Sequence, residues 1–428
     1  MVIDSLIDAL RRCCEGFPDF RTGTNCHYGM ADIGMAAFSV FFMQSPSFLS
    51  HQRALEAARS RSNCETLFAM DRIPTDNHIR KMLDPVAADA VFGLFGRTLE
   101  LLTGRGGLKD FHRLDGRVLI ALDGTEYFTS QKLHCPNCSR RKRSNGKTEH
   151  YHSLVCAALV APGHNQALPL EPEFITPQDG HGKEDCENAA VKRWLGRFGA
   201  HYAHLDPVYL GDDLYARQPI CKDIQGLGAH FLFTAKPSSH KCLYEWLDGV
   251  ELPVHEEKVK KGRRFVTHRY RWLEGVPLRD GTDALHVNWL EIEIVNAAGK
   301  VTYTNSFVTD LAVDATTVAE LAACGRARWK IENETFNTMK TKGYHLEHNF
   351  GHGKENLAAL LATMNLLAFA IHTVCDLVEK IWRQARTTLG SRRRFFQDLR
   401  SITRYLVFAD WDALIRTLIT GEPPPEPP

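Results

Sequence analysis

The spacing of hydrophobic and polar positions along the chain changes after about residue 112. Before that point the pattern is helical, with an apolar stretch at residues 31–43 and a short helix expected at residues 77–83. After it, short uninterrupted apolar runs predict buried strands. These runs span residues 117–123, 152–160, 167–175, 207–212 and 230–236, and a helix is predicted at residues 184–198 between the third run and the fourth.

The order of these elements predicts the fold class. Three strands, a helix, and then strand, connection and strand is the order of a ribonuclease-H-like α/β core, in which the first and fourth strands lie side by side. Asp123 ends the first strand ahead of an expected turn at Gly124, and Asp212 ends the fourth strand. The two carboxylates are therefore expected to meet although they are far apart in the chain.

A different pattern follows the fifth apolar run. Residues 264–272, 286–295 and 301–309 are predicted strands, several with alternating apolar and polar positions. They indicate an all-β insertion that interrupts the α/β core. Two helical segments then follow, at residues 316–340 and 354–386.

These patterns divide the chain into five parts. The expected parts are an N-terminal helical region (1–112), the first part of the core (113–236), the β insertion (237–310), the second part of the core with a glutamate-bearing helix (311–386), and a C-terminal helical segment with a Pro-rich tail (387–428).

Composition is that of an ordinary globular protein that buries a large core, with 44% hydrophobic and 24% charged residues among 428. The net charge is only +1, so any surface for nucleic acid has to come from local basic patches. Such patches occur at residues 140–143, 258–264 and 392–394, and each is equally compatible with a solvated loop.

No membrane association is expected. Charged residues such as Asp4 and Arg11 interrupt any signal-peptide pattern. The apolar run at residues 357–378 contains Asn365 and Asp376, which favours a buried core helix over a membrane span. Twelve scattered cysteines suggest reduced thiols, and the expected location is the cytoplasm.

Glu332 completes a candidate metal site with the two strand-end aspartates. It lies four positions after Arg328 and shares its helix face. Phosphodiester chemistry uses two divalent cations, and Mg²⁺ prefers a few carboxylates plus water and substrate phosphate. Asp123 would bridge both ions, while Asp212 and Glu332 would each hold one.

Each acid also has a structural interpretation. Asp123 before Gly124 is compatible with a simple turn residue. Asp213 follows Asp212 directly, and the sequence leaves the choice between them open. Glu332 alone could be a surface acid paired with Arg328. The metal hypothesis depends on all three acids falling in the expected elements in the expected order.

Three short motifs carry a family resemblance. They are Leu-Asp-Gly-Thr-Glu-Tyr-Phe around Asp123, Tyr-Leu-Gly-Asp-Asp-Leu-Tyr around Asp212, and Arg-Trp-Lys-Ile-Glu ending at Glu332. With the β insertion, they resemble bacterial insertion-sequence transposases of the DDE type that carry a Tyr-Arg-Glu-Lys signature. The sequence departs from that signature, because Gly325 stands at the tyrosine position and Met339 at the lysine position.

The resemblance implies metal-dependent cleavage at the ends of a mobile element and strand transfer into target DNA, and by analogy residues 1–112 would bind those ends. Mg²⁺ or Mn²⁺ would be the cofactor, and the partners would be terminal inverted repeats, target DNA and further copies of the chain on that DNA. Arg328 would clamp a phosphate, a task suited to a guanidinium. Trp329 would stack on a flipped base, although a core position is the commoner role for a tryptophan. Lys340, one step after Met339, would reach a phosphate, and a location at the bacterial nucleoid would follow.

A possible zinc site is a further hypothesis. Cys135 and Cys138 form a Cys-x-x-Cys pair, and His150 and His152 follow in the chain. These are zinc ligand types at a suggestive spacing. The alternative is a basic, DNA-facing hairpin with reduced cysteines.

Two other functions remain open from the sequence. One is a catalytically inactive or domesticated transposase that acts only as a DNA-binding regulator. The other is a ribonuclease-H-like nuclease without strand transfer. Cleavage products, with or without joined target DNA, would separate these functions from transposition.

Overall fold

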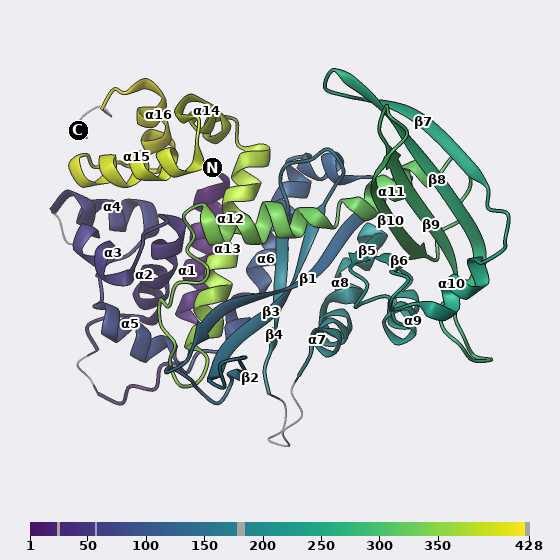
Figure 1. Cartoon of the computed structure of the whole chain (residues 1–428). Coiled ribbons are helices and arrows are strands. Elements are labelled where there is room, and N and C mark those ends of the chain that lie inside the picture. The colour runs from purple at the N-terminus through teal and green to yellow at the C-terminus, as the bar shows by residue number, and fades with distance from the viewer. Residues whose placement is uncertain (24–25, 56–57, 178–184, 424–428) are drawn as a thin grey trace.

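The computed structural model describes residues 1–23, 26–55, 58–177 and 185–423. Its N-terminal region is helical, as predicted (Figure 1). The helices are α1 (Val2–Glu15), α2 (Met30–Phe42), α3 (Phe48–Leu55), α4 (Ala58–Phe68), α5 (Asp76–Leu83) and α6 (Gly93–Gly104). Every residue of α2 is buried, because its apolar side chains lie on all sides of the helix.

One mixed sheet of ten strands runs through the described part of the chain. Its strands are β1 (Val118–Ser130), β2 (Ser139–Lys142), β3 (Thr148–Val160), β4 (Leu168–Ile175), β5 (Pro207–Gly211), β6 (His230–Thr234), β7 (Val254–Lys261), β8 (Arg264–Pro277), β9 (His286–Val295) and β10 (Val301–Thr309). The order is β2-β3-β1-β5-β6-β10-β9-β8-β7, with β4 also paired to β3. The large mixed sheet and the N-terminal helices are consistent with a ribonuclease-H-like domain.

The expected pairing of the first and fourth core strands is confirmed. β1 and β5 are parallel neighbours, with Val118 opposite Pro207 and Ala121 opposite Leu210. The turn expected after Asp123 is wrong, because β1 continues to Ser130 and Gly124 pairs with Val155 of β3. The Asp-Gly pair therefore lies inside a long strand.

The β insertion is continuous with the core sheet. β10 pairs antiparallel with β6, so the four strands β7 to β10 extend the edge of the core (Figure 1). The sequence analysis missed β7, whose outer position leaves most of its residues exposed or half-buried.

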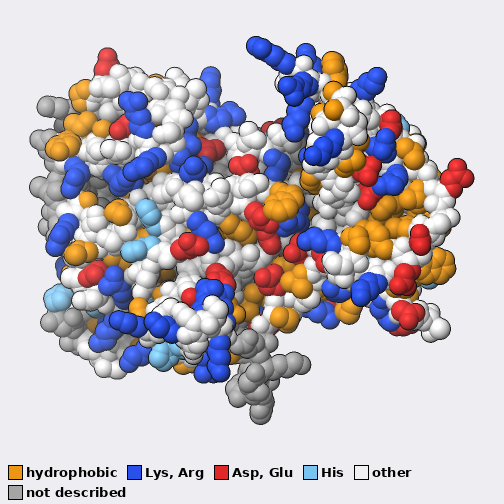
Figure 2. Space-filling view, in the orientation of Figure 1, with side chains coloured by type: hydrophobic (Ala, Val, Ile, Leu, Met, Phe, Trp, Pro, Cys, Tyr) orange, Lys and Arg blue, Asp and Glu red, His pale blue; other side chains and the backbone are white. Residues whose placement is uncertain are grey.

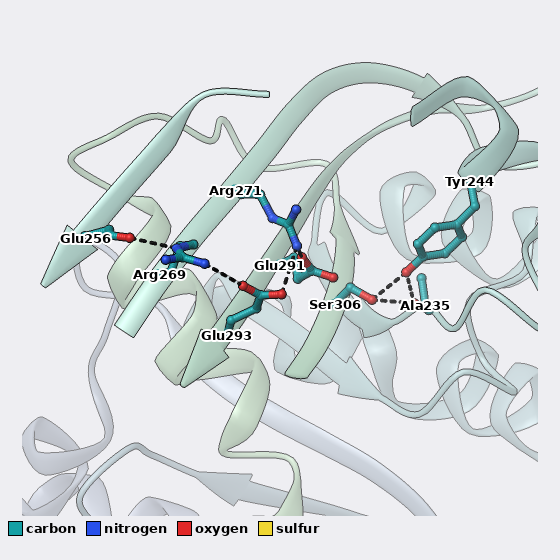
Figure 3. Close-up of polar contacts among 8 residues, drawn as sticks. All are labelled: Ala235, Tyr244, Glu256, Arg269, Arg271, Glu291, Glu293 and Ser306. Atoms are coloured by element: carbon teal, nitrogen blue, oxygen red, sulfur yellow. Dashed lines mark hydrogen bonds and ion pairs between the residues drawn. The ribbon is translucent and has the colours of Figure 1, made fainter. Parts of the chain in front are cut away.

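Ion pairs connect neighbouring strands of the insertion (Figure 3). Arg269 of β8 contacts Glu256 of β7 at 2.7 Å and Glu293 of β9 at 3.4 Å. Arg271 pairs with Glu291 and, at 3.1 Å, with Glu293. Opposite charges facing each other across strands favour this register over a shifted one.

The insertion is also joined to the core by hydroxyl groups. The Tyr244 hydroxyl of α10 (Lys241–Leu247) donates to the carbonyl of Ala235, just after β6, at 2.8 Å (Figure 3). Ser306 of β10 donates to the same carbonyl at 2.8 Å. These contacts fix the base of the insertion to the strand that precedes it.

Helices cover the core sheet. α7 (Glu187–Trp194) continues into a π-helical turn at Leu195–Gly199, and the predicted start at Glu184 lies outside the described residues. Further helices follow at Ala200–Tyr202 (α8) and Gln218–Gly226 (α9).

The long apolar helix α13 (Leu357–Val378) is a core helix. It is long and apolar enough to cross a membrane, but 89% of its most apolar stretch is buried inside the protein. It packs against α2, α6 and β4, which joins the N-terminal helices to the sheet. The predicted helix 354–386 is divided at Glu379, and α14 (Lys380–Leu389), α15 (Arg392–Tyr405) and α16 (Trp411–Thr420) follow. Residues 424–428 of the predicted Pro-rich tail lie outside the described residues.

The predicted helix at residues 316–340 is not one continuous α-helix. It consists of α11 (Val318–Arg326), a π-helical turn at Ile331–Phe336 and α12 (Asn337–Thr341). The wider turn changes which later side chains share a face with Glu332. π-helical turns inside helices are frequent at functional sites.

Candidate active site

The parallel pairing of β1 and β5 positions two of the predicted acids. Ala121 and Leu210 are opposite each other, so continuing that register by two residues sets Asp123 beside Asp212. Figure 2 shows Asp and Glu side chains grouped near the centre of one face, over the region where these strands meet. The sheet thus brings together carboxylates from distant parts of the sequence.

Arg328 connects Asp123 to the third predicted acid. Its Nη1 lies 3.4 Å from a carboxylate oxygen of Asp123 and 3.0 Å from Oε1 of Glu332. The arginine is only 6% exposed, so its charge is held between these two groups. The guanidinium therefore holds the π-helical turn against β1 and orients Glu332 toward Asp123.

A fourth carboxylate, Glu187, was missed by the sequence analysis. It begins α7, and its Oε2 accepts a 3.0 Å hydrogen bond from the hydroxyl of Tyr215. A Cβ atom at Gly124 would lie 2.5 Å from the Glu187 carboxyl group. The glycine after Asp123 therefore makes room for Glu187. The presence of glycine at this position is the signal in the sequence that reflects Glu187.

Burial and mutual repulsion raise the pKa values of two of the acids. Desolvation raises the pKa of Asp123 to about 7, opposed by Arg328 and supported by the charges of Glu332, Asp212 and Glu187. Desolvation also raises the pKa of Glu187, with Asp212 adding to the effect. Perturbed acids of this kind concentrate at functional sites.

The donor set suits a hard divalent cation. The four carboxylates outnumber the single guanidinium among them, so the fully ionised cluster carries excess negative charge. Mg²⁺ and Mn²⁺ bind carboxylate oxygens in such surroundings. Asp123, Asp212 and Glu332 are the residues that would hold the metal, with Glu187 close by.

The structure distinguishes Asp212 from Asp213. One carboxylate oxygen of Asp213 accepts from the backbone N–H of Lys236 at 2.6 Å, and the other accepts from the hydroxyl of Ser239. Asp212 uses Oδ1 to accept from the N–H of Leu214 at 2.8 Å. Asp213 is thus committed to the chain that follows β6, which favours Asp212 as the metal ligand.

The predicted DNA-binding residues have different surroundings. The interpretation of Trp329 as a core residue is wrong, because its side chain is 48% exposed. The guanidinium carbon of Arg328 lies 4.5 Å from the Trp329 ring centroid, so a cation–π contact supports the ring from one side. Nζ of Lys340 pairs with Glu347 at 2.9 Å. Of the three, Trp329 presents the most accessible surface.

The two departures from the signature follow from packing. A Cβ atom at Gly325 would lie 2.6 Å from the ring of Phe307 in β10, so a tyrosine there would require Phe307 to move. Met339 is fully buried in α12, beyond the π-helical turn that carries Glu332, so the lysine position of the signature lies in the core.

The structure brings together three of the four predicted zinc ligands. Cys135, Cys138 and His152 cluster with His352. His150 lies outside this group, and its ring stacks on His134 with centroids 4.6 Å apart. His352 occupies the position in the cluster that was predicted for His150. The sequence analysis did not connect His352 to the cysteines because it lies far from them in the chain.

Exposed basic side chains occupy the β7–β8 hairpin. Lys260, Lys261 and Arg263 are exposed at its tip, and the neighbouring Phe265 is 59% exposed. Figure 2 shows Lys and Arg side chains gathered on the projection that Figure 1 identifies as this hairpin. Basic charge beside an exposed ring is typical of a surface that binds single- or double-stranded nucleic acid.

A second basic surface lines a cavity of about 930 Å³ beside the π-helical turn. Its lining includes Lys342, Arg392, Arg393 and Arg400, together with Glu334 from the turn itself. The cavity thus adjoins the segment that carries Glu332.

Comparison with known proteins identifies one family. The model described as a transposase DDE domain matches residues 116–370, which include all four clustered carboxylates. No curated protein matches the chain.

Proposed function

Because this chain belongs to the family of transposases with a DDE domain, we propose that it cleaves DNA at the ends of a mobile element and joins those ends to target DNA. Members of the family use divalent metal ions. The observation that carries the proposal is the convergence of Asp123, Asp212 and Glu332 from three separate elements. The raised pKa of Asp123 supports the same site.

The metal would supply an activated nucleophile and stabilise charge on the transferring phosphate. The chain's own residues hold and orient the ligands. Arg328 keeps Glu332 facing Asp123 across the sheet. Tyr215 holds the Glu187 carboxylate next to the strand that carries Asp123. With its guanidinium engaged by both acids, Arg328 serves first to position the site, and contact with a scissile phosphate would require exchange of one carboxylate partner.

DNA would approach along the face that carries the exposed ring of Trp329. Stacking of a base on that ring is supported by its exposure and by the cation beneath it. The basic tip of the β7–β8 hairpin and the basic cavity beside the π-helical turn would bind phosphates on either side. The proposed substrates are terminal inverted repeats and target DNA. The proposed setting is a bacterial nucleoid, with further copies of the chain assembled on the DNA.

The test is cleavage and joining of labelled DNA that carries the ends of the element encoding this chain. Wild type is compared with Glu332→Gln, which keeps the side-chain shape and removes the charge. Glu334→Gln is the matched control, because Glu334 lies on the same turn outside the acid cluster, and removing its negative charge from the basic cavity should not weaken binding of DNA. Metal-dependent nicks and joined products are expected from wild type and the control only.

Each other result has a defined meaning. Nicks without joined products would favour a nuclease without strand transfer. Equal DNA binding by wild type and Glu332→Gln with no cutting by either would favour a DNA-binding regulator. Full cleavage by Glu332→Gln would exclude Glu332 as a metal ligand and contradict the proposed site.

A further inference from the structure

A second cluster of potential metal ligands lies beside the far end of β1, the strand that carries Asp123. Cys135 and Cys138 are in the loop between β1 and β2, His152 is in β3, and His352 is in the segment between α12 and α13. One ligand atom from each residue lies within 4.8 Å of every other. The cluster therefore joins two regions that are distant in sequence.

The distances within the cluster match a tetrahedral zinc site. Zn–S bonds of about 2.3 Å and Zn–N bonds of about 2.0 Å require S···S separations of about 3.8 Å and S···N separations of about 3.5 Å. The two sulfurs are 3.9 Å apart, and Nε2 of His152 lies 3.5 and 3.4 Å from them. Nε2 of His352 lies 3.6 Å from Sγ of Cys138. These separations leave room for a central ion and exceed the length of a disulfide bond.

Aromatic packing orients both imidazoles. His152 stacks on Tyr127 with ring centroids 5.6 Å apart, and Phe128 lies 4.4 Å from the ring of His352. Tyr127 and Phe128 belong to the part of β1 that extends beyond Asp123. The long strand thus provides the wall against which the Nε2 atoms face the sulfurs.

Other contacts bring the His352 segment to the cysteine loop. The carboxylate of Asp84 accepts from the backbone N–H groups of Lys354 at 2.8 Å and Glu355 at 3.0 Å. The side chain of Asn137, between the two cysteines, donates to the carbonyl of Glu355 at 2.7 Å. These hydrogen bonds hold the segment that carries His352 against the cysteine loop. The fourth ligand is therefore positioned before a metal binds, as a preorganised site requires.

We propose that Cys135, Cys138, His152 and His352 bind one structural zinc ion that fastens the segment after the glutamate-bearing helix to the β1–β3 hairpin. Four protein ligands fill the tetrahedral coordination of zinc, which is the composition of a structural rather than a catalytic site. The segment fastened in this way begins at the end of α12, so the ion limits movement of the turn that carries Glu332.

The experiment measures zinc content by mass spectrometry in full-length protein purified without chelator. Wild type is expected to contain about one zinc ion per chain. Cys138→Ser and His352→Ala are expected to contain almost none. His150→Ala is the matched control, because His150 lies on the same strand as His152 but outside the cluster, and it should retain the wild-type zinc content.

A second measurement keeps the test decisive if a variant folds poorly. His352→Cys preserves a possible ligand and should retain zinc. Wild type refolded with Co²⁺ should show the visible absorption of a tetrahedral thiolate site, and hydrogen exchange at residues 343–356 should slow when zinc is added to metal-free protein. These outcomes do not depend on transposase activity, so they are separable from the proposed function.

Three results would overturn the proposal. They are wild-type protein that neither contains nor acquires zinc under reducing conditions, a disulfide between Cys135 and Cys138 in wild-type protein purified under reducing conditions, and loss of zinc in His150→Ala with full retention in His352→Ala.

Discussion

The acid cluster and the Cys/His cluster both contact strand β1, and they differ in donor atoms and in charge. Asp123 and Phe128 are five positions apart on β1, or about 17 Å of extended chain. Around Asp123 the donors are oxygens with excess negative charge and one buried guanidinium. Around Phe128 the donors are sulfur and nitrogen at the separations of a closed tetrahedral site.

Under the two proposals, the difference separates a site for chemistry from a site for fixation. Carboxylates that repel one another bind a metal with positions left for water and substrate. Two thiolates and two imidazoles fill the coordination of a zinc ion. His352 follows Glu332 in the chain, so the proposed zinc ion would limit movement of the turn that carries Glu332.

The largest expected effect is a loss of DNA cleavage that leaves zinc content unchanged. Asp212→Asn should lower DNA cleavage by roughly 10²–10³-fold, because loss of a metal ligand removes several kcal/mol of transition-state stabilisation. Its zinc content should equal that of wild type. The neighbouring Asp213→Asn should instead lower the free energy of unfolding by about 0.5–1.5 kcal/mol, since asparagine can keep only one of the two hydrogen bonds that Asp213 accepts from the chain after β6. Cleavage that depends on Asp213 and not on Asp212 would reverse the assignment.

The next effect concerns DNA held beside the acids. Trp329→Ala should weaken DNA binding by roughly 5- to 150-fold, the range expected for loss of one base-stacking contact. Stability should change little, because the ring is 48% exposed. Trp246→Ala is the matched control, since Trp246 is 59% exposed on α10 of the insertion. Equal binding by wild type and Trp329→Ala, measured by fluorescence anisotropy, would remove the stacking role.

A smaller effect tests the fourth carboxylate. Gly124→Ala should displace Glu187 and lower cleavage by roughly 10-fold, because the added methyl group would lie 2.5 Å from the carboxyl group and costs about 1–3 kcal/mol. Glu187→Gln should reproduce part of this loss. Gly196→Ala is the control, since nothing lies within 4 Å of a Cβ atom there. Unchanged cleavage in both Gly124→Ala and Glu187→Gln would show that Glu187 is not needed.

The smallest expected effect is a pH dependence of stability. The pKa of Asp123 is raised to about 7 in the folded protein, mainly by burial. The folded state therefore holds this proton more tightly than the unfolded state, and stability falls as pH rises from about 4 to 7. Without magnesium, the Tm of wild type should decline over this interval more steeply than that of Asp123→Asn. Parallel curves would show that Asp123 ionises normally.

The sequence located the acid cluster better than its surroundings. Apolar runs located β1 and β5, and the motifs around Asp123, Asp212 and Glu332 identified the three acids that the fold brings together. The choice of Asp212 over Asp213 required the hydrogen bonds made by Asp213 to the chain after β6.

Residues that act across long sequence separations escaped prediction. Glu187 and His352 reach their clusters from elements that no local spacing connects to them. Trp329 is exposed, although the sequence favoured a core position as the commoner role for a tryptophan. Local pattern therefore identified the elements, and tertiary packing decided which side chains complete each cluster.

The most direct test of the central claim is Mn²⁺ binding by zinc-loaded protein, followed by electron paramagnetic resonance. If Asp123, Asp212 and Glu332 form the metal site, wild type and Glu334→Gln should bind Mn²⁺ equally. Asp123→Asn should bind it at least about tenfold more weakly, because a carboxylate ligand to a hard cation is lost. Equal Mn²⁺ affinity in wild type and Asp123→Asn would contradict the assignment of this cluster as the metal centre.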